Sequence, residues 1–191
     1  MVYTNLKDSP QTLHGLFESS RLTTTDTGRI YDALVVKDMT DKEAIDVDNG
    51  VAVKIHDFTG DGLQEVYATV ATIKDKIAVV GAPADVKSAM TMAQAQPYNF
   101  YIPAGTSAKT HQVRAEDDDI FGVALYQFTT ASVANVKKDA YVVVDGNGMW
   151  VAQAAAPDAT KYGFIGKVHS VSQGSYYTIV RILAVQNKDI A

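Results

Sequence analysis

The C-terminal part of the chain, from Asp119 to Gln186, alternates short apolar runs with tight-turn signals, and this pattern restricts the possible folds most strongly. The runs are rich in β-branched and aromatic residues, a composition typical of strands. They predict five strands, at Ile120 to Phe128, Tyr141 to Val144, Met149 to Gln153, Phe164 to Val171 and Tyr176 to Val185. Asp145 to Gly148 and Ser172 to Ser175 supply the Gly, Asn and Ser residues that compact hairpin turns need. The sequence therefore predicts a mainly β protein.

The last of these runs carries apolar side chains on both faces. Tyr177, Ile179 and Leu183 share one face of an extended strand, while Val180 and Ile182 share the other. A sheet with one face in water does not need this arrangement. We therefore expect both faces to be buried, the second one against a neighbouring domain or subunit.

The 191 residues are enough for one domain or two small ones, and we expect two small β-sheet or β-barrel-like domains after an extended N-terminal arm. Residues 1–29 are rich in Thr and Ser and form the predicted arm. Residues 30–114 contain short apolar runs separated by Gly, Asp and Asn, which predict a β-rich domain. Residues 115–191 are expected to form a small β-barrel or β-sandwich. The runs of the first domain are Ile30 to Val36, Val51 to Ile55, Val66 to Ile73 and Ile77 to Val80.

One or two short helices are expected beside the strands. An Ala- and Met-rich interval has helical spacing of its apolar residues and predicts a helix near 84–95. In the arm, Ser9-Pro10 has the residue types of a helix start, which would place Leu13, Leu16 and Phe17 on one face. That face either packs on its own domain, the interpretation we favour, or contacts a neighbouring subunit.

The composition narrows the classes of partner. The net charge is −5 and the longest basic run is Lys137-Lys138, so we expect no nucleic-acid partner. The sequence contains neither a long apolar span nor a basic-then-apolar leader, so we expect no membrane partner and synthesis in the cytosol. It also contains no Cys, so stability has to come from burial, hydrogen bonds or association.

One loop has the spacing of a metal site. Asp57, Thr59, Asp61 and Glu65 stand at positions one, three, five and nine of a Gly-containing segment, and this spacing resembles the calcium loops of integrin-type propeller repeats. The chain has a single copy, and Thr59 replaces the expected Asn or Asp. We favour a Gly-rich hairpin turn between two strands, with calcium as the alternative and no other cofactor expected.

Other polar groups give no catalytic constellation, so we expect a protein that is not an enzyme. The carboxylates of Asp117 to Asp119 alternate in direction along an extended chain and are expected to be solvated guards of a strand edge. The four histidines are far apart in the sequence. Trp150 is expected to pack on a core or an interface, with a carbohydrate-stacking platform as the alternative.

Between about Asn49 and Phe128, the segments Asn49 to Val51, Glu65 to Tyr67 and Ile120 to Val123 resemble structural proteins encoded in the virion gene clusters of tailed bacteriophages. Phe164 to Val168 and Tyr177 to Ile182 are similar to the terminal hairpin of small capsid-associated β domains. The resemblance implies a virion protein that assembles in the host cytoplasm and carries no catalytic or cofactor residue in these segments.

The resemblance further implies a decoration, head-stabilising or head-fibre-anchoring protein that binds the major capsid protein or other virion proteins. We expect a homo-oligomer, such as a trimer, that contacts its partner through Leu13, Leu16, Phe17, Tyr98 and Tyr101. We also expect that deleting residues 1–22 abolishes capsid binding and leaves the β domains folded. The alternatives are a tail or baseplate component and a calcium- or glycan-binding β module.

Overall fold

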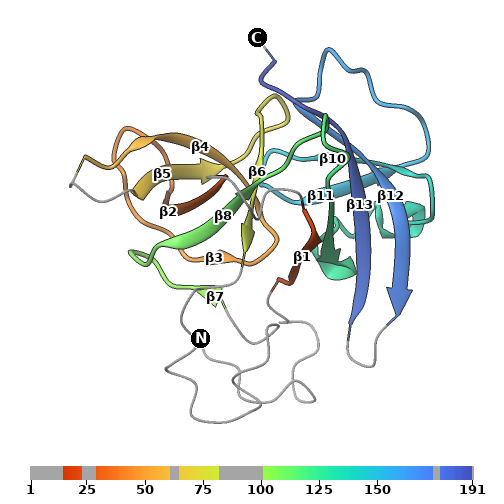
Figure 1. Ribbon diagram of the computed structural model, residues 1–191, viewed down its shortest axis with the longest axis horizontal. Helices are drawn as coiled ribbons and strands as arrows, with labels where there is room; N and C mark the ends of the chain where they lie inside the picture. The colour runs from red at the N-terminus through yellow and green to blue at the C-terminus, as the bar shows by residue number, and fades with distance from the viewer. Residues whose placement is uncertain (1–14, 23–28, 61–64, 82–100, 174–176, 191) are drawn as a thin grey trace.

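The computed structural model describes residues 15–22, 29–60, 65–81, 101–173 and 177–190 (Figure 1). In these residues the chain is mainly β, with strands arranged as a closed barrel, a six-stranded sheet and a two-stranded ladder. The predicted fold class is confirmed. Within the described part, no helix has the length and apolarity needed to cross a bilayer.

Five strands close into a barrel in the order β2-β5-β4-β6-β8. Their bounds are β2 Ile30–Val36, β4 Ala52–Phe58, β5 Glu65–Val70, β6 Ala78–Gly81 and β8 Ala108–Gln112. β2 and β5 are parallel and the other pairs are antiparallel. Mostly Ala and Val side chains fill the interior, which suits the narrow bore of a barrel with so few strands. The short strands β3 (Val47–Asp48) and β7 (Tyr101–Ile102) pair with each other and add Val47 and Ile102 to this core.

Six strands form an antiparallel sheet in the order β1-β9-β13-β12-β10-β11. Their bounds are β1 Phe17–Arg21, β9 Ile120–Ala124, β10 Tyr141–Val144, β11 Trp150–Gln153, β12 Phe164–Gln173 and β13 Thr178–Asn187. The predicted hairpin of the last two strands is confirmed, and so is the turn at Asp145 to Gly148. In this turn the Asp145 carboxylate accepts hydrogen bonds from the backbone N–H groups of Asn147 and Met149, and Gly148 has a φ of 70°.

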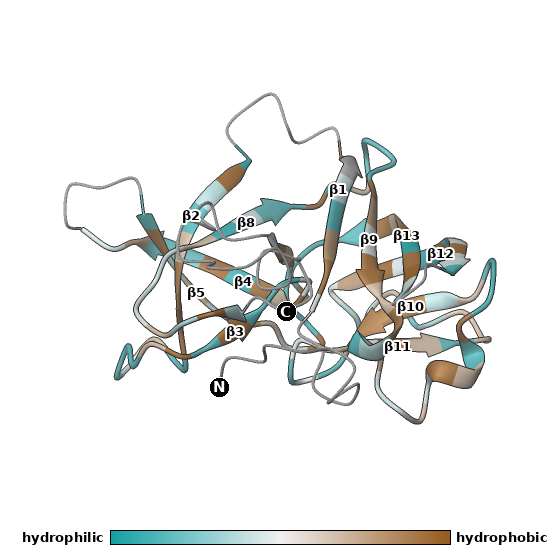
Figure 2. Cartoon of the chain, turned by 90° about the horizontal axis from the view of Figure 1, so that it is seen from below, coloured by the Kyte–Doolittle hydropathy of each residue, from teal (hydrophilic) through white to brown (hydrophobic). Residues whose placement is uncertain are grey.

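The barrel and the sheet share a hydrophobic core. Alternation along β4 sends Val53 into the barrel and Ala52 into the core beneath the sheet. On β6, Ala78 and Val80 likewise face the barrel interior while Val79 faces the sheet. Figure 2 shows the barrel and the sheet side by side with β1 between them. The two β units therefore pack through strands that are buried on both faces.

The N-terminal segment differs from the expected helical arm. Phe17 begins strand β1, which pairs with β9 through Phe17 and Val123, so the predicted helix is wrong at Leu16 and Phe17. The Phe17 ring packs 4.9 Å from the His111 ring and 6.3 Å from the Phe121 ring, measured between centroids. Long-range sheet pairing thus decides the conformation of this segment.

Two other predictions concern helices and strand ends. The helix expected near 84–95 lies outside the described residues. The strand expected from Ile120 to Phe128 ends at Ala124, and the chain continues as a 3₁₀ turn, η5 (Leu125–Gln127). The reason is a local hydrogen bond, because the Gln127 side-chain oxygen accepts the Ala124 N–H at 2.8 Å and folds the chain back. A second 3₁₀ turn, η6, spans Val133–Asn135.

The two faces of β13 are not equally buried. Val180 and Ile182 are fully buried in the shared core, while Ile179 and Leu183 on the opposite face are half-buried and Val185 is 49% exposed. Within the single chain the second face is therefore not fully covered, and its burial against a neighbouring subunit stays a prediction. The outer face of β13 is therefore mixed: Ile179 and Leu183 are half-buried on either side of Arg181, which pairs with Glu18.

Candidate functional site

The segment with calcium-loop spacing is the hairpin that joins β4 and β5. The Thr59 N–H donates to the Glu65 carbonyl oxygen at 2.9 Å, and the Ser107 hydroxyl donates to the Glu65 carboxylate. Asp57 is exposed and Asp61 lies outside the described residues. Among the residues that the structure describes, no three His, Cys, Asp or Glu side chains gather in a metal-binding group. The hairpin is the favoured interpretation, and calcium binding stays a prediction.

Of the expected partner-binding residues, the three that the structure describes do not form one exposed patch. Leu16 is 6% exposed, and its N–H donates to the Gln127 side chain at 3.1 Å. Phe17 is half-buried against the shared core, and Tyr101 is half-buried on β7. Leu13 and Tyr98 lie outside the described residues. Leu16 and Phe17 therefore contribute to the chain's own packing, the alternative that we favoured for this face.

The acidic run before β9 is only partly solvated, which corrects the sequence interpretation. Asp119 is 0% exposed and accepts a hydrogen bond from the Arg114 N–H at 2.8 Å. Asp117 pairs with Arg29 at 2.8 Å, and this hydrogen-bonded guanidinium lowers the pKa of the carboxyl below its ordinary value. The run thus ties the loop before β9 to the barrel rather than serving as a free edge guard.

Trp150 and His111 lie in structural surroundings. The Trp150 ring is 0% exposed, packs against Phe121 and Phe164, and donates its N–H to the Gly50 carbonyl oxygen at 2.9 Å. A fully buried ring presents no face to a sugar, so the carbohydrate platform is wrong for this residue. Burial lowers the pKa of His111, whose ring lies under Phe17.

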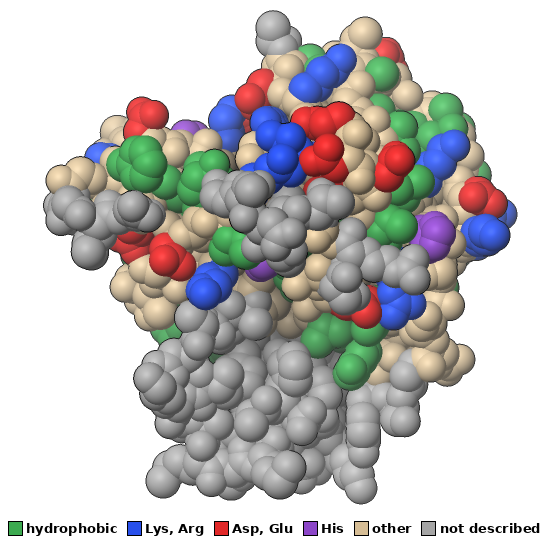
Figure 3. Space-filling model, viewed as in Figure 1, with side chains coloured by type: hydrophobic (Ala, Val, Ile, Leu, Met, Phe, Trp, Pro, Cys, Tyr) green, Lys and Arg blue, Asp and Glu red, His purple; other side chains and the backbone are tan. Residues whose placement is uncertain are grey.

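A groove opens on the described surface at the end of the β9–β13 pair. We call it the aromatic groove; it encloses about 550 Å³ and is lined by Leu125, Tyr126, Phe128, Thr130, Val133, Tyr177 and Thr178. One wall is η5 with the residues that lead into η6, and the other wall is the beginning of β13. Figure 3 shows hydrophobic side chains at the surface near the lower end of β13. The groove joins the outer face of β13, because Tyr177 and Ile179 alternate onto the same side.

Tyr126 has the most perturbed ionisation in the groove. Burial raises the pKa of its phenol well above the ordinary value of 10, and the negative charge of Asp48 adds to this effect. The hydroxyl stays neutral at physiological pH, as that of an ordinary tyrosine does, and the side chain combines an aromatic ring with a polar hydroxyl. Such a side chain suits a contact that is partly apolar and partly hydrogen-bonded.

Sequence reasoning missed the groove because Leu125 and Tyr126 continue the apolar alternation of β9. The residues that line its walls are far apart in sequence, and only the pairing of Ile179 with Ala124 brings them together. Thr129 and Thr130, which follow Phe128, indicate the end of a strand but do not indicate a groove.

No family model, no curated protein and no solved structure matches the chain.

Proposed function

We propose that this chain is a non-enzymatic structural protein of a tailed-phage virion that binds the major capsid protein and decorates or stabilises the head. The sequence resemblance motivates the class of particle. The observation that carries the binding role is the aromatic groove together with the half-buried outer face of β13.

The groove has the properties of a protein-contact site. Its walls contain the half-buried side chains of Leu125, Tyr126, Val133 and Tyr177, with Phe128 buried behind them, and no acidic or basic side chain lines it. Cores of protein interfaces are enriched in Tyr and Phe and depleted of charge. The partner is expected to insert an apolar side chain between Tyr126 and Tyr177, where desolvation contributes most of the binding energy.

We propose a different contact region for the major capsid protein from the one that the sequence predicts. The arm residues Leu16 and Phe17 are used within the chain, so the proposed contact moves from the arm to the groove. Ile179 and Leu183 extend the contact along β13, on either side of the ion pair between Arg181 and Glu18. This arrangement keeps the expected role of the C-terminal hairpin in assembly.

A sedimentation assay tests the proposal. The purified protein is mixed with shells assembled from the major capsid protein of the same gene cluster and centrifuged through a sucrose cushion. Wild-type protein is expected to pellet with the shells. Thr130→Arg, which places a long charged side chain at the exposed rim of the groove, is expected to bind at least about tenfold more weakly.

The control is Thr106→Arg, the same change at an exposed position between β7 and β8. It is expected to pellet like the wild type. Wild-type protein that stays in the supernatant contradicts capsid binding. Equal pelleting of the Thr130→Arg and wild-type proteins contradicts the groove as the contact. Labelled protein imaged on the tail rather than the head supports the alternative of a tail or baseplate component.

A further inference from the structure

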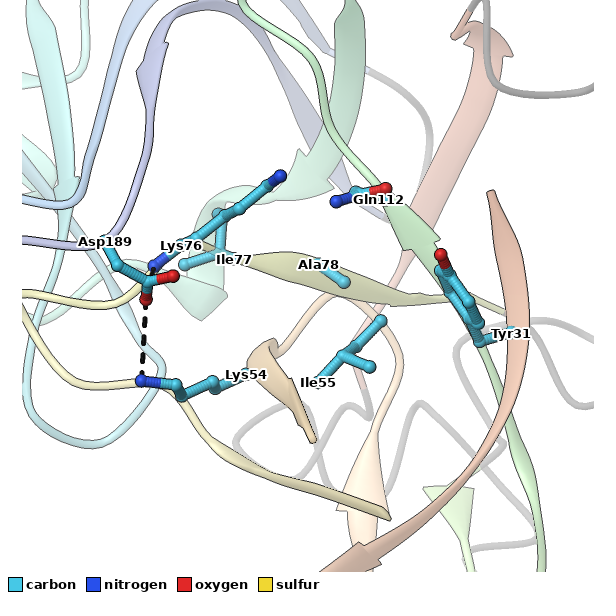
Figure 4. Close-up of a pocket in the computed structure, with 8 residues that line it drawn as sticks. All are labelled: Tyr31, Lys54, Ile55, Lys76, Ile77, Ala78, Gln112 and Asp189. Atoms are coloured by element: carbon cyan, nitrogen blue, oxygen red, sulfur yellow. Dashed lines mark hydrogen bonds and ion pairs between the residues drawn. The ribbon is translucent and has the colours of Figure 1, made fainter. Parts of the chain in front are cut away.

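A second cavity opens at one end of the barrel and encloses about 180 Å³ (Figure 4). Its apolar lining includes Ile55, Ile77 and Ala78. Ala78 belongs to the barrel core, and Tyr31 and Ile55 pack against that core, so the cavity is the mouth of the barrel. Barrel mouths are recurrent sites for small molecules, because side chains of several strands converge there.

One side of the mouth is already occupied by the chain's own carboxylates. The Lys54 ammonium lies 2.7 Å from the Asp75 carboxylate and 3.5 Å from that of Asp189. The hydrogen bond to Asp75 raises the pKa of Lys54. Lys54 therefore stays protonated, and the nearby carboxylates balance its positive charge. The Lys76 backbone N–H also donates to Asp189 at 3.0 Å. This side therefore has little capacity left for a ligand.

The other side of the mouth carries unused hydrogen-bond donors. Among the described residues, no carboxylate pairs with the Lys76 ammonium. No side chain or backbone group there forms a hydrogen bond with the side-chain amide of Gln112 or with the Tyr31 hydroxyl. Figure 4 shows the Lys76 side chain extending toward Gln112, with the Tyr31 hydroxyl across the opening. An ammonium, an amide N–H and a phenol are all able to donate to one anionic group.

We propose that the barrel mouth binds a small organic monocarboxylate. Its carboxylate accepts hydrogen bonds from Lys76 and Gln112, and its apolar body rests on Ile55 and Ala78. Lys54 cannot replace Lys76, because its charge is shared by Asp75 and Asp189. The apolar floor favours an organic acid over an inorganic anion, which has no surface to bury there.

The cavity volume limits the size of the ligand. A volume of about 180 Å³ corresponds to about six water molecules, each of which occupies about 30 Å³ in the liquid. This fits a single aromatic ring or a short alkyl chain with its carboxylate. Pockets for drug-sized ligands are larger, about 300 Å³ and above. Benzoate is therefore a suitable probe, and benzamide is its neutral analogue of the same shape.

Amide-resolved NMR titration of the full chain with sodium benzoate tests the proposal. We expect saturable shifts of the Tyr31, Ile55, Ala78 and Gln112 resonances and at least about tenfold weaker binding of benzamide, because its neutral carbonyl group lacks the charge–charge attraction to Lys76. Absence of saturable shifts at these residues overturns the proposal. Equal affinity for benzoate and benzamide overturns the role of the carboxylate.

Two substitutions locate the site. Lys76→Gln removes the charge at an exposed side chain and is expected to weaken benzoate binding at least about tenfold, while Lys137→Gln, at another exposed lysine, leaves it unchanged. Ile55→Trp is expected to fill the mouth and abolish binding, with the amide spectrum away from the barrel preserved. Benzoate binding that persists in both the Lys76→Gln and Ile55→Trp proteins overturns the assignment. Benzoate binding is tested independently of capsid binding, because Thr130 lines the aromatic groove and not the barrel mouth.

Discussion

At the scale of single residues, Gln127 joins three segments that are distant in the sequence. Its side-chain oxygen accepts hydrogen bonds from the N–H groups of Leu16 at 3.1 Å and Ala124 at 2.8 Å. Its amide nitrogen donates to the Asn49 carbonyl oxygen at 2.6 Å. The side chain is 5% exposed, so water does not readily replace these partners. One amide thus connects the N-terminal segment, the barrel and the sheet.

Gln127→Met keeps the size of this side chain and removes both polar atoms. We expect the free energy of unfolding to fall by about 3 kcal/mol or more, because three buried backbone groups each lose a partner at a cost of about 1–3 kcal/mol. Urea denaturation measures the change. Gln153→Met on β11, a half-buried glutamine, is the matched control and should change stability little. Equal losses of stability in the two proteins would show that the hydrogen bonds of the Gln127 side chain make no specific contribution to the free energy of unfolding.

At the scale of elements, β1 is an edge strand held by contacts to both units. Glu18 accepts hydrogen bonds from two guanidinium nitrogens of Arg181 on β13, at 2.8 and 3.1 Å, and the Phe17 ring lies against the ring of His111 on β8. Removing β1 opens the edge of β9 and uncovers this packing. Truncating the arm therefore has a structural effect that the sequence did not predict.

Deletion of residues 1–22 is now expected to destabilise the chain, whereas deletion of residues 1–14 retains the contribution of β1. We expect the longer deletion to lower the free energy of unfolding by at least about 3 kcal/mol, since truncating one packed Phe side chain already costs about 3–5 kcal/mol. We also expect concentration-dependent self-association through the open edge of β9. Chemical denaturation and sedimentation velocity measure the two effects. If the two truncated proteins have the same stability, β1 is dispensable for the fold.

The elements differ in how far the sequence predicts them. The hairpin turn at Asp145 to Gly148 and the strands β10 and β2 follow from local composition, because turn residues and alternation act over a few positions. The closure of the barrel, the pairing of β1 with β9 and the aromatic groove depend on contacts between distant segments. Local apolar alternation even misassigned Tyr126, because the hydrogen bonds of Gln127 override it.

At the scale of the whole molecule, the barrel and the sheet are not separated by a polar interface. β4 and β6 each contribute side chains to both hydrophobic clusters, and Trp150 of the sheet donates a hydrogen bond to Gly50 beside the barrel. A loss of packing in one cluster displaces strands that also form the other. The two units are therefore expected to unfold together.

Val53→Ala tests this coupling, because Val53 is fully buried in the barrel interior whereas Trp150, the single Trp, reports on the core beneath the sheet. We expect the substitution to cost about 2 kcal/mol by leaving a cavity, within the range for removing buried methyl groups. The urea midpoint measured by Trp150 fluorescence should fall together with the midpoint measured by circular dichroism, in one transition. The exposed Val185→Ala protein should keep the wild-type midpoint. A Trp150 transition that stays in place while the circular dichroism shifts would mean that the barrel and the sheet unfold independently.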